Sequence, residues 1–238
     1  MFVAIFAIGI SFIIILFFYY LFPFFLRKLE EKRLRKYCRD HGILVLTYDD
    51  GPGPILTTRL LAIFQNEQVR ATFFFLGWKS AKYRDIVLKA KEAGHEIGFH
   101  GQHHCNSWKV APWTALSDIK QGYQTLSGLM SGNPVFRPPF GKLSIITWAA
   151  LKLKKIRIGW WTYVSGDTYE KFKSIDDILK EVAENNGGII LMHDADRPKR
   201  TSEYEAFVVA LSQRLIILAR EQKMQIKTLG EILDESMG

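Results

Sequence analysis

Two adjacent carboxylates, Asp49 and Asp50, follow the apolar run 43–46 and directly precede Gly51 and Pro52. An apolar run that ends in turn residues predicts a buried strand. Two carboxylates that face one cleft can hardly both stay ionised without a cation, so we expect one to bind a metal and the other to act as a base. The same residues are also typical of a solvated turn, and this stretch alone does not decide between the two interpretations.

His100 and His104 are four residues apart in the segment FHGQHHC. On a helical turn this spacing places both imidazoles on one face, where they can bind one metal ion. A histidine pair is a weak signal by itself, but a carboxylate from the Asp-Asp pair would complete a His₂Asp site. Such a site suits Zn²⁺, with Co, Mn, Ni or Fe as alternatives that the sequence does not separate. We expect His103 to be exposed on another face and Cys105 to be a small buried residue rather than a ligand.

Arg137 lies in the proline-rich segment FRPPFG, and His193 lies in LMHDAD. An arginine beside carboxylates holds one of them ionised and oriented, and a site histidine is the usual proton donor near neutral pH. The alternatives are a surface arginine in a turn and a structural histidine. After His193, the residues Arg197, Lys199 and Arg200 form a basic cluster that either binds a substrate phosphate or is a solvated loop.

The rest of the chain alternates between apolar runs and helical spacing. We predict strands at 43–48, 72–76, 96–100, 134–137, 156–162, 187–192 and 225–228. We predict helices at 54–66, 79–93, 111–130, 142–154, 174–185, 203–222 and 229–236. About seven such units predict a closed or nearly closed parallel barrel, with an open doubly wound sheet as the alternative.

The chemically capable residues all follow predicted strands: Asp49, Asp50, His100, His104, Arg137, Asp167 and His193. The C-terminal ends of the strands are where parallel barrels and open α/β sheets place their sites. We therefore expect these side chains to meet at one face. The tryptophans are candidates for core and for stacking on sugar rings, and the loop from Trp108 to Trp113 is a candidate rim.

Residues 2–26 carry no charged side chain, and seven Lys or Arg residues follow between positions 27 and 39. The length suits a transmembrane helix, and the ending at Phe24, Phe25 and Leu26 is unlike a signal-peptide cleavage site. We predict an anchor at 1–26, a basic juxtamembrane helix at 27–41 that lies against anionic headgroups, and a catalytic domain at 42–238. The positive-inside rule then predicts a single-pass protein of the inner (cytoplasmic) membrane with its domain in the cytoplasm.

The formal net charge of +8 over 238 residues favours an anionic partner, and two cysteines do not make a disulfide framework. Five ordered segments then point to a family, namely TYDDGP, ATFFFLG, GHEIGFHGQHH, RPPFG and GGIILMHD. Together, from Ile43 to about Leu233, they resemble the polysaccharide deacetylase family, also called NodB-homology or carbohydrate esterase family 4. The resemblance implies a distorted (β/α) barrel of about seven parallel strands.

The resemblance implies Asp50, His100 and His104 as metal ligands. It implies Asp49 as base and His193 as acid, with Arg137 orienting Asp49 and Asp167 orienting His193. Two departures stand out. Gly101 replaces a Ser or Thr whose hydroxyl braces the histidine loop, and the stretch 164–168 lacks the first Asp and the Trp of the family pattern. The second departure puts the role of Asp167 and the shape of the sugar pocket in doubt.

These groups fit metal-assisted hydrolysis of an acetamide, with the backbone N–H of Phe140 at the oxyanion. We expect Trp161, Arg197 and Lys199 to contact the substrate. A cytoplasmic, membrane-bound domain favours a polyprenyl-phosphate-linked N-acetylhexosamine used in lipid A modification, and no nucleic acid. Two alternatives stay open: a deacetylase of exported peptidoglycan or chitin-like polysaccharide, and a non-catalytic carbohydrate-binding module on the membrane.

Overall fold

The computed structural model describes residues 16–130, 132–196 and 201–237. Within these ranges, eight strands form one sheet in which every pairing is parallel. The strands are β1 (Ile43–Asp49), β2 (Thr72–Phe75), β3 (Glu96–Phe99), β4 (Val135–Phe136), β5 (Arg157–Ile158), β6 (Tyr163–Val164), β7 (Gly187–His193) and β8 (Gln225–Ile226). Their order is β5-β4-β3-β2-β1-β7-β6, and β8 pairs with the start of β1.

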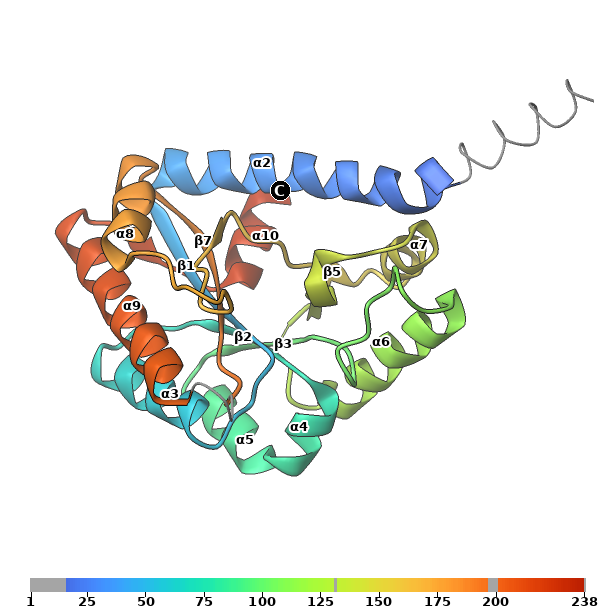
Figure 1. Ribbon diagram of the computed structural model, residues 1–238, viewed down its shortest axis with the longest axis horizontal. Coiled ribbons are helices and arrows are strands. Elements are labelled where there is room, and N and C mark those ends of the chain that lie inside the picture. Colours follow the sequence, from blue (N-terminus) through green and yellow to red (C-terminus); the bar gives the residue numbers. More distant parts are fainter. Residues whose placement is uncertain (1–15, 131, 197–200, 238) are drawn as a thin grey trace, which may run out of the picture.

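Helices surround this sheet and cover its outer face (Figure 1). They are η1 (Phe17–Leu21), α2 (Phe22–His41), α3 (Leu56–Asn66), α4 (Gly77–Lys82), α5 (Arg84–Glu92), α6 (Pro112–Leu126), the single turn η2 (Pro139–Gly141), α7 (Ile145–Leu153), α8 (Ile175–Glu184), α9 (Thr201–Glu221) and α10 (Leu229–Met237). The helix predicted at 79–93 is two helices, because the chain leaves helical geometry at Tyr83.

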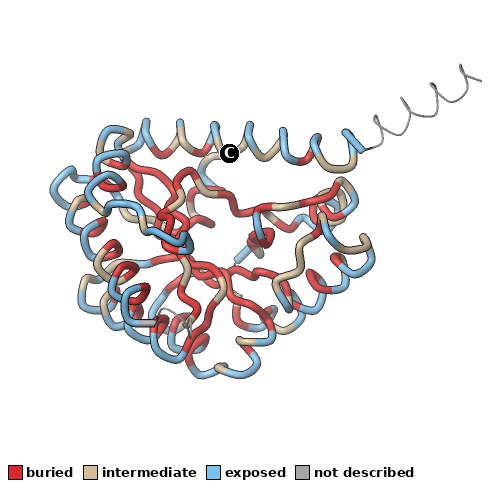
Figure 2. Tube along the Cα trace, viewed as in Figure 1, coloured by how far each residue is buried: buried red, intermediate tan, exposed pale blue. Residues whose placement is uncertain are grey.

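All seven residues of β1 are buried, and so are the four of β2. The tube in Figure 2 shows buried residues along the strands at the centre and exposed residues on the outer turns of the helices. Strands that are apolar on both faces are expected where helices pack outside a sheet and its inner face is filled by side chains. The prediction of a parallel α/β sheet is confirmed.

The barrel is incomplete. Strands β5 and β6 are neighbours in the chain but lie at opposite ends of the sheet, and no ladder joins them among the described residues. The strand predicted at 156–162 is present only as β5, which ends at Ile158, and the shortening has a physical reason. The carbonyls of Gly159 and Trp160 accept hydrogen bonds from the Arg137 guanidinium, at 3.1 and 3.4 Å, so these carbonyls point to a side chain rather than to a neighbouring strand.

Helix α2 lies along this side of the molecule (Figure 1). Leu34 and Cys38 on its inner face are completely buried in the main core. Arg35 donates a hydrogen bond to the carbonyl of Thr162, between β5 and β6, and its guanidinium lies 4.3 Å from the ring of Tyr163. The basic segment predicted at 27–41 is therefore packed on the domain over part of its surface.

Residues 1–15 of the membrane segment predicted at 1–26 lie outside the described residues. In the part of the chain that is described, no helix is both long and apolar enough to cross a bilayer. The membrane anchor stays a prediction.

Replacing Leu34 by Ala tests whether α2 belongs to the core. We expect the free energy of unfolding to fall by about 2–5 kcal/mol, because a completely buried leucine leaves a cavity. Leu29 lies on the same helix with half of its surface exposed, and Leu29→Ala should change stability by less than ~0.5 kcal/mol. Denaturant unfolding of both variants measures the difference. A loss of stability for Leu34→Ala as small as that for Leu29→Ala would mean that α2 is not part of the core.

Candidate active site

Four strand ends bring the predicted residues together. Asp49 ends β1, and its register partner on the adjacent strand is His193, the last residue of β7. His100 directly follows β3, and Arg137 directly follows β4. The C-terminal ends of parallel strands meet at one edge, so residues that are distant in sequence converge there.

Asp50, His100 and His104 each offer one ligand atom, and these atoms all lie within 4.8 Å of one another. The Nε2 atoms of His100 and His104 lie 3.6 and 3.2 Å from Asp50 Oδ1. Burial and the neighbouring His100 lower the pKa of His104, which favours the neutral imidazole that a metal requires. Two imidazoles and a carboxylate are a donor set for a first-row divalent ion with coordination positions left for water or substrate.

A second contact fixes which nitrogen of His100 faces the cluster. Its Nδ1 lies 2.7 Å from the carbonyl oxygen of Arg137. A carbonyl can only accept, so Nδ1 carries the proton and Nε2 presents its lone pair toward Asp50. The residue after the fourth strand therefore orients a candidate ligand with its backbone.

The loop that carries the two histidines is held by Asp118, a residue that the sequence interpretation missed. Its buried carboxylate accepts hydrogen bonds from the backbone N–H of Gln102 (3.2 Å) and His103 (2.8 Å). A Cβ at Gly101, where φ is +82°, would lie 2.3 Å from Asp118 Oδ2. The Asp118 carboxylate thus occupies the space that a Ser or Thr side chain at position 101 would take. The available signal was an acid at helical spacing among the buried residues of α6.

Asp49 and Arg137 form a buried ion pair. Arg137 has no exposed surface, and its Nη1 donates to Asp49 Oδ1 at 2.8 Å and to the hydroxyl of Thr47 at 2.7 Å. Burial lowers the pKa of Arg137, while the Asp49 carboxylate opposes that shift. The guanidinium also lies 4.1 Å from the ring of Phe74. One carboxylate of the Asp-Asp pair therefore already has its own cation, and the other faces the two histidines.

His193 is bonded to Asp167 in two ways. Its backbone N–H donates to Asp167 Oδ2 at 2.7 Å, and its Nδ1 lies 3.0 Å from Oδ1. Burial lowers the pKa of His193, but the Asp167 carboxylate outweighs burial and, with Asp50 and Asp49, raises the pKa to about 9. An imidazole that is protonated at neutral pH can donate a proton. Asp167 holds it in place although the surrounding family pattern is incomplete.

Two more groups beside Asp50 were not predicted. Lys79 Nζ donates to the backbone carbonyl of Asp50 at 2.7 Å. Asp194 is completely buried, receives a hydrogen bond from the Thr57 hydroxyl at 2.7 Å, and has its pKa raised by burial to about 7. These contacts hold the turn that follows Asp50, where φ is +73°. Asp194 stands in the segment LMHDAD, but nothing in that segment distinguishes a buried acid from an exposed one.

The predicted substrate contacts are only partly near the cluster. The ring of Phe140 lies 4.5 Å from that of His104, and Phe140 adopts φ +57° in the turn η2. Trp161 lies between two guanidinium groups, 4.4 Å from that of Arg27 and 5.5 Å from that of Arg137. Arg197 and Lys199 lie outside the described residues.

The two tryptophans of the candidate rim at 108–113 lie in different places. Trp108 Nε1 donates to the carbonyl of Leu143 at 2.8 Å, and Lys142 Nζ lies 4.0 Å from its ring. Trp113 instead lines a separate groove between α6 and α7. Only the first part of the predicted rim therefore adjoins the Phe140 loop.

Replacing each of two adjacent histidines by alanine, in separate variants, tests the metal site. His104→Ala should reduce Zn²⁺ affinity in calorimetric titration by at least 100-fold, because it removes one of three protein ligands. His103 is exposed on the same loop, and His103→Ala should leave the affinity within about twofold. Similar losses in both variants would mean that the ion binds elsewhere or that the loop simply unfolds.

The pKa of His193 should depend on Asp167. In the metal-free protein, Asp167→Asn removes the carboxylate that raises this pKa, so the imidazole should titrate well below 9. A raised pKa contributes stability that is fully present below the unfolded value near 6.5 and lost as pH rises through about 9, so the variant should lose stability mainly at neutral and acid pH.

Imidazole NMR titration measures the shift directly. Asp176→Asn, at an exposed acid on α8, is the matched control and should leave His193 unchanged. A bound divalent ion offsets the charges of Asp50 and Asp49, so the pKa in metal-loaded protein should lie below that of the metal-free form. An unaltered titration in Asp167→Asn would contradict the proposed pairing.

Comparison with known proteins identifies the family to which the chain is similar. The sequence model of the family described as polysaccharide deacetylase matches residues 36–159. A peptidoglycan-N-acetylglucosamine deacetylase of Bacillus cereus is 24% identical over 80% of this chain and 88% of that protein. A second protein of that name from the same organism is 34% identical over 63% of this chain and 55% of its own length. The chain therefore spans from about half to nearly nine tenths of these relatives.

Solved structures agree in fold. A peptidoglycan N-acetylglucosamine deacetylase in complex with an N-oxidanyl-benzamide superimposes with a TM-score of 0.71 at 25% identity, covering 80% of this chain and 87% of that one. A family 4 carbohydrate esterase from Streptomyces lividans in complex with acetate gives 0.62 at 26% identity, covering 78% and 91%. A pseudoenzyme from Bacillus anthracis gives 0.65 at 21% identity, covering 81% and 66%, so the fold alone does not decide activity.

Proposed function

We propose that this chain, which belongs to the polysaccharide deacetylase family, deacetylates an amino sugar of an exported polysaccharide. Members of this family hydrolyse the amide bond of N-acetylated sugars. One observation carries the proposal. The candidate metal ligands Asp50, His100 and His104 are flanked by a carboxylate held by Arg137 and an imidazole held by Asp167. A base, an acid and a divalent ion are what acetamide hydrolysis requires.

We assign the ligand roles to Asp50, His100 and His104. A divalent ion bound there supplies polarisation of the acetyl carbonyl and a water of lowered pKa. Two nitrogen donors and one carboxylate favour Zn²⁺ within the first-row series. Asp49 lies on one flank, with Oδ2 3.8 Å from His100 Nε2, and accepts the proton of the attacking water.

His193 is the proton donor on the other flank. The raised pKa keeps its imidazole charged at neutral pH, so it can protonate the departing amine. The backbone N–H of Phe140 stabilises the oxyanion, and the exposed ring of Phe140 borders the cluster beside His104. Acetate and a free amino sugar leave.

The substrate follows from the named relatives rather than from the charge of this chain. They include deacetylases of N-acetylglucosamine and of N-acetylmuramic acid in peptidoglycan. A lipid-linked monosaccharide gains no support from these relatives, and the expectation of a cytoplasmic domain depended on the basic segment 27–39. Arg27 and Arg35 in that segment bind backbone carbonyls of the domain, which weakens that expectation. We therefore propose an anchored domain on the outer side.

Asp49→Asn tests the catalytic assignment. We expect kcat for acetate release from N-acetylglucosamine oligomers to fall by about 10²–10⁴, because the neutral amide cannot accept the water proton. Metal content should be retained, because Asp49 Oδ1 is bound to Arg137 and Asp49 is not among the clustered ligand atoms. Asp85→Asn, at an exposed acid on α5, is the control and should keep full activity.

Parallel assays on a peptidoglycan oligomer and on a polyprenyl-phosphate-linked N-acetylhexosamine decide the substrate class. Preference for the oligomer supports the proposal, and preference for the lipid-linked sugar would restore the first hypothesis. Full turnover by Asp49→Asn would overturn the assignment of the base. Absence of turnover by metal-loaded wild-type protein on every acetylated sugar would point to a non-catalytic binding module.

A further inference from the structure

The positive charge of the chain is concentrated in one region. Residues 119–166 contain no Asp or Glu but seven Lys or Arg residues, whereas the whole chain has a net charge of +8. Arg137 and Arg157 in this region are paired with Asp49 and Asp234. The five lysines of the region form no ion pair with the described residues: Lys120, Lys142, Lys152, Lys154 and Lys155. Three of them gather at the end of α7.

Large apolar side chains are exposed among these lysines. Leu153 at the end of α7 is 85% exposed, and Trp113 at the start of α6 is 75% exposed. Ile146 in the first turn of α7 is also exposed. We call these three residues, together with Lys152, Lys154 and Lys155, the α7 surface. A protein surface that faces water rarely combines large exposed apolar side chains with uniform positive charge. This combination is typical of segments that lie at a membrane interface.

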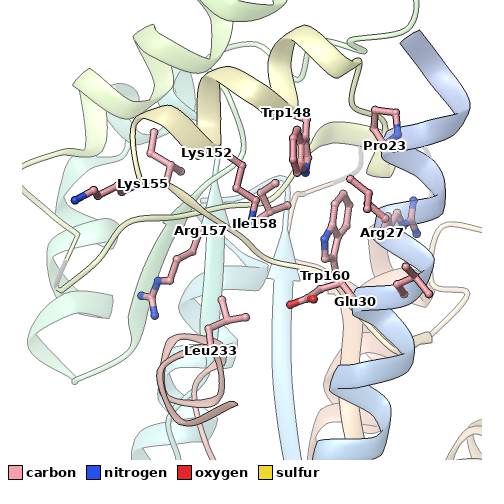
Figure 3. Close-up of a pocket in the computed structure, with 13 residues that line it drawn as sticks. Pro23, Arg27, Glu30, Trp148, Lys152, Lys155, Arg157, Ile158, Trp160 and Leu233 are labelled. Carbon is pink, nitrogen blue, oxygen red and sulfur yellow. The ribbon is translucent and has the colours of Figure 1, made fainter. Parts of the chain in front are cut away.

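Two grooves border the α7 surface. The first, of about 420 Å³, lies between α7 and α2 (Figure 3). Trp148 and Lys152 of α7 face Pro23 and Arg27 of α2 across it, and Trp160 lies between them. The second, of about 540 Å³, lies between α7 and α6 and is mostly apolar, with Lys154 in its lining. Each groove joins an apolar wall to a lysine, which suits an acyl chain and a phosphate.

The α7 surface lies next to the N-terminal part of the described chain. Helix α7 lies at the same end of the molecule as η1 and the start of α2 (Figure 1), and α7 contacts both. The ring of Tyr20 packs against that of Trp108, with centroids 5.4 Å apart. Phe17, Phe18, Leu21 and Phe25 of η1 and α2 are exposed at this end. Exposed apolar groups thus extend from the N-terminal helix to α7.

Most basic side chains of α2 already have partners within the protein. Lys28 pairs with Glu31, Arg33 with Glu30 and Lys36 with Asp40. Arg27 and Arg35 reach the carbonyls of Gly141 and Thr162. Lys32 is exposed and forms neither an ion pair nor a hydrogen bond with the described residues, so α2 keeps one such cation, whereas three such lysines lie together at the end of α7.

We propose that the α7 surface binds an anionic phospholipid bilayer. The lysines contact phosphate headgroups, and Leu153, Ile146 and Trp113 enter the boundary between headgroups and acyl chains. This contact would fix how the domain sits on a membrane to which the segment predicted at 1–26 would anchor it. The inference is independent of the catalytic proposal, because none of these residues belongs to the candidate active site.

The test uses the full chain in lipid nanodiscs. In a Cys105→Ser background, an environment-sensitive fluorophore is attached at Leu153→Cys, and its emission is compared in phosphatidylglycerol-containing and pure phosphatidylcholine discs. We expect a blue shift that is larger with phosphatidylglycerol and is reduced by high salt. The same fluorophore at Leu88→Cys, an exposed apolar position on α5, should not shift.

The triple variant Lys152→Gln, Lys154→Gln, Lys155→Gln should lower the ratio of docked to free domain on the order of 100-fold, from the contribution of each lysine near an anionic surface. Lys89→Gln, Lys171→Gln, Lys180→Gln removes three exposed charges elsewhere and should leave the ratio unchanged. Both triple variants should keep wild-type turnover of soluble oligomers, which separates a docking failure from a failure of the catalytic proposal.

Three results would overturn the inference. The first is emission at position 153 that is the same in discs and in lipid-free micelles. The second is a shift that is equal in both lipids and unaffected by the lysine variant. The third is a shift that appears with a soluble polyanionic glycan, or rises with protein concentration, but is absent from discs, because a polymer or a second copy of the chain would then be the partner.

Discussion

Two neighbouring carboxylates at the end of one strand impose the constraint that organises this molecule. Asp49 is buried and Asp50 is partly buried, and each requires a positive partner to remain ionised in the same cleft. Arg137 provides that partner for Asp49 at 2.8 Å. The imidazoles of His100 and His104 lie beside Asp50 instead, and we propose a divalent ion, which this group of ligand atoms can bind, as its partner.

Arg137 also influences the opening of the barrel. Its guanidinium bonds to the carbonyls of Gly159 and Trp160, so these carbonyls do not pair with a further strand, although the Gly159 N–H still donates to the carbonyl of Phe136 in β4. The barrel remains open between β5 and β6, and α2 packs on that side through Leu34, Arg35 and Cys38. The helix that the sequence suggested as a membrane-surface segment is thus partly a structural support, and Arg27 on it reaches the Phe140 loop through Gly141.

Sequence reasoning predicted the elements and the converging side chains because apolar runs and helical spacing are local signals. It could not predict the opening between β5 and β6, because Gly159 and Trp160 are diverted by an arginine more than twenty residues away. Asp118 was missed for a similar reason: its partners on the histidine loop come from another element. The pairing of basic residues of 27–39 with Glu30, Glu31 and Asp40 could not be predicted either, because it is settled only by side-chain geometry.

A crystal structure of zinc-loaded protein, phased on the anomalous signal of the metal, tests the central claim most directly. We predict one ion about 2.0–2.2 Å from a carboxylate oxygen of Asp50 and from Nε2 of His100 and His104, with Asp49 still bound to Arg137. An ion bound by Asp49 after displacement of Arg137, or an ion distant from these histidines, would contradict the division of roles between the two carboxylates.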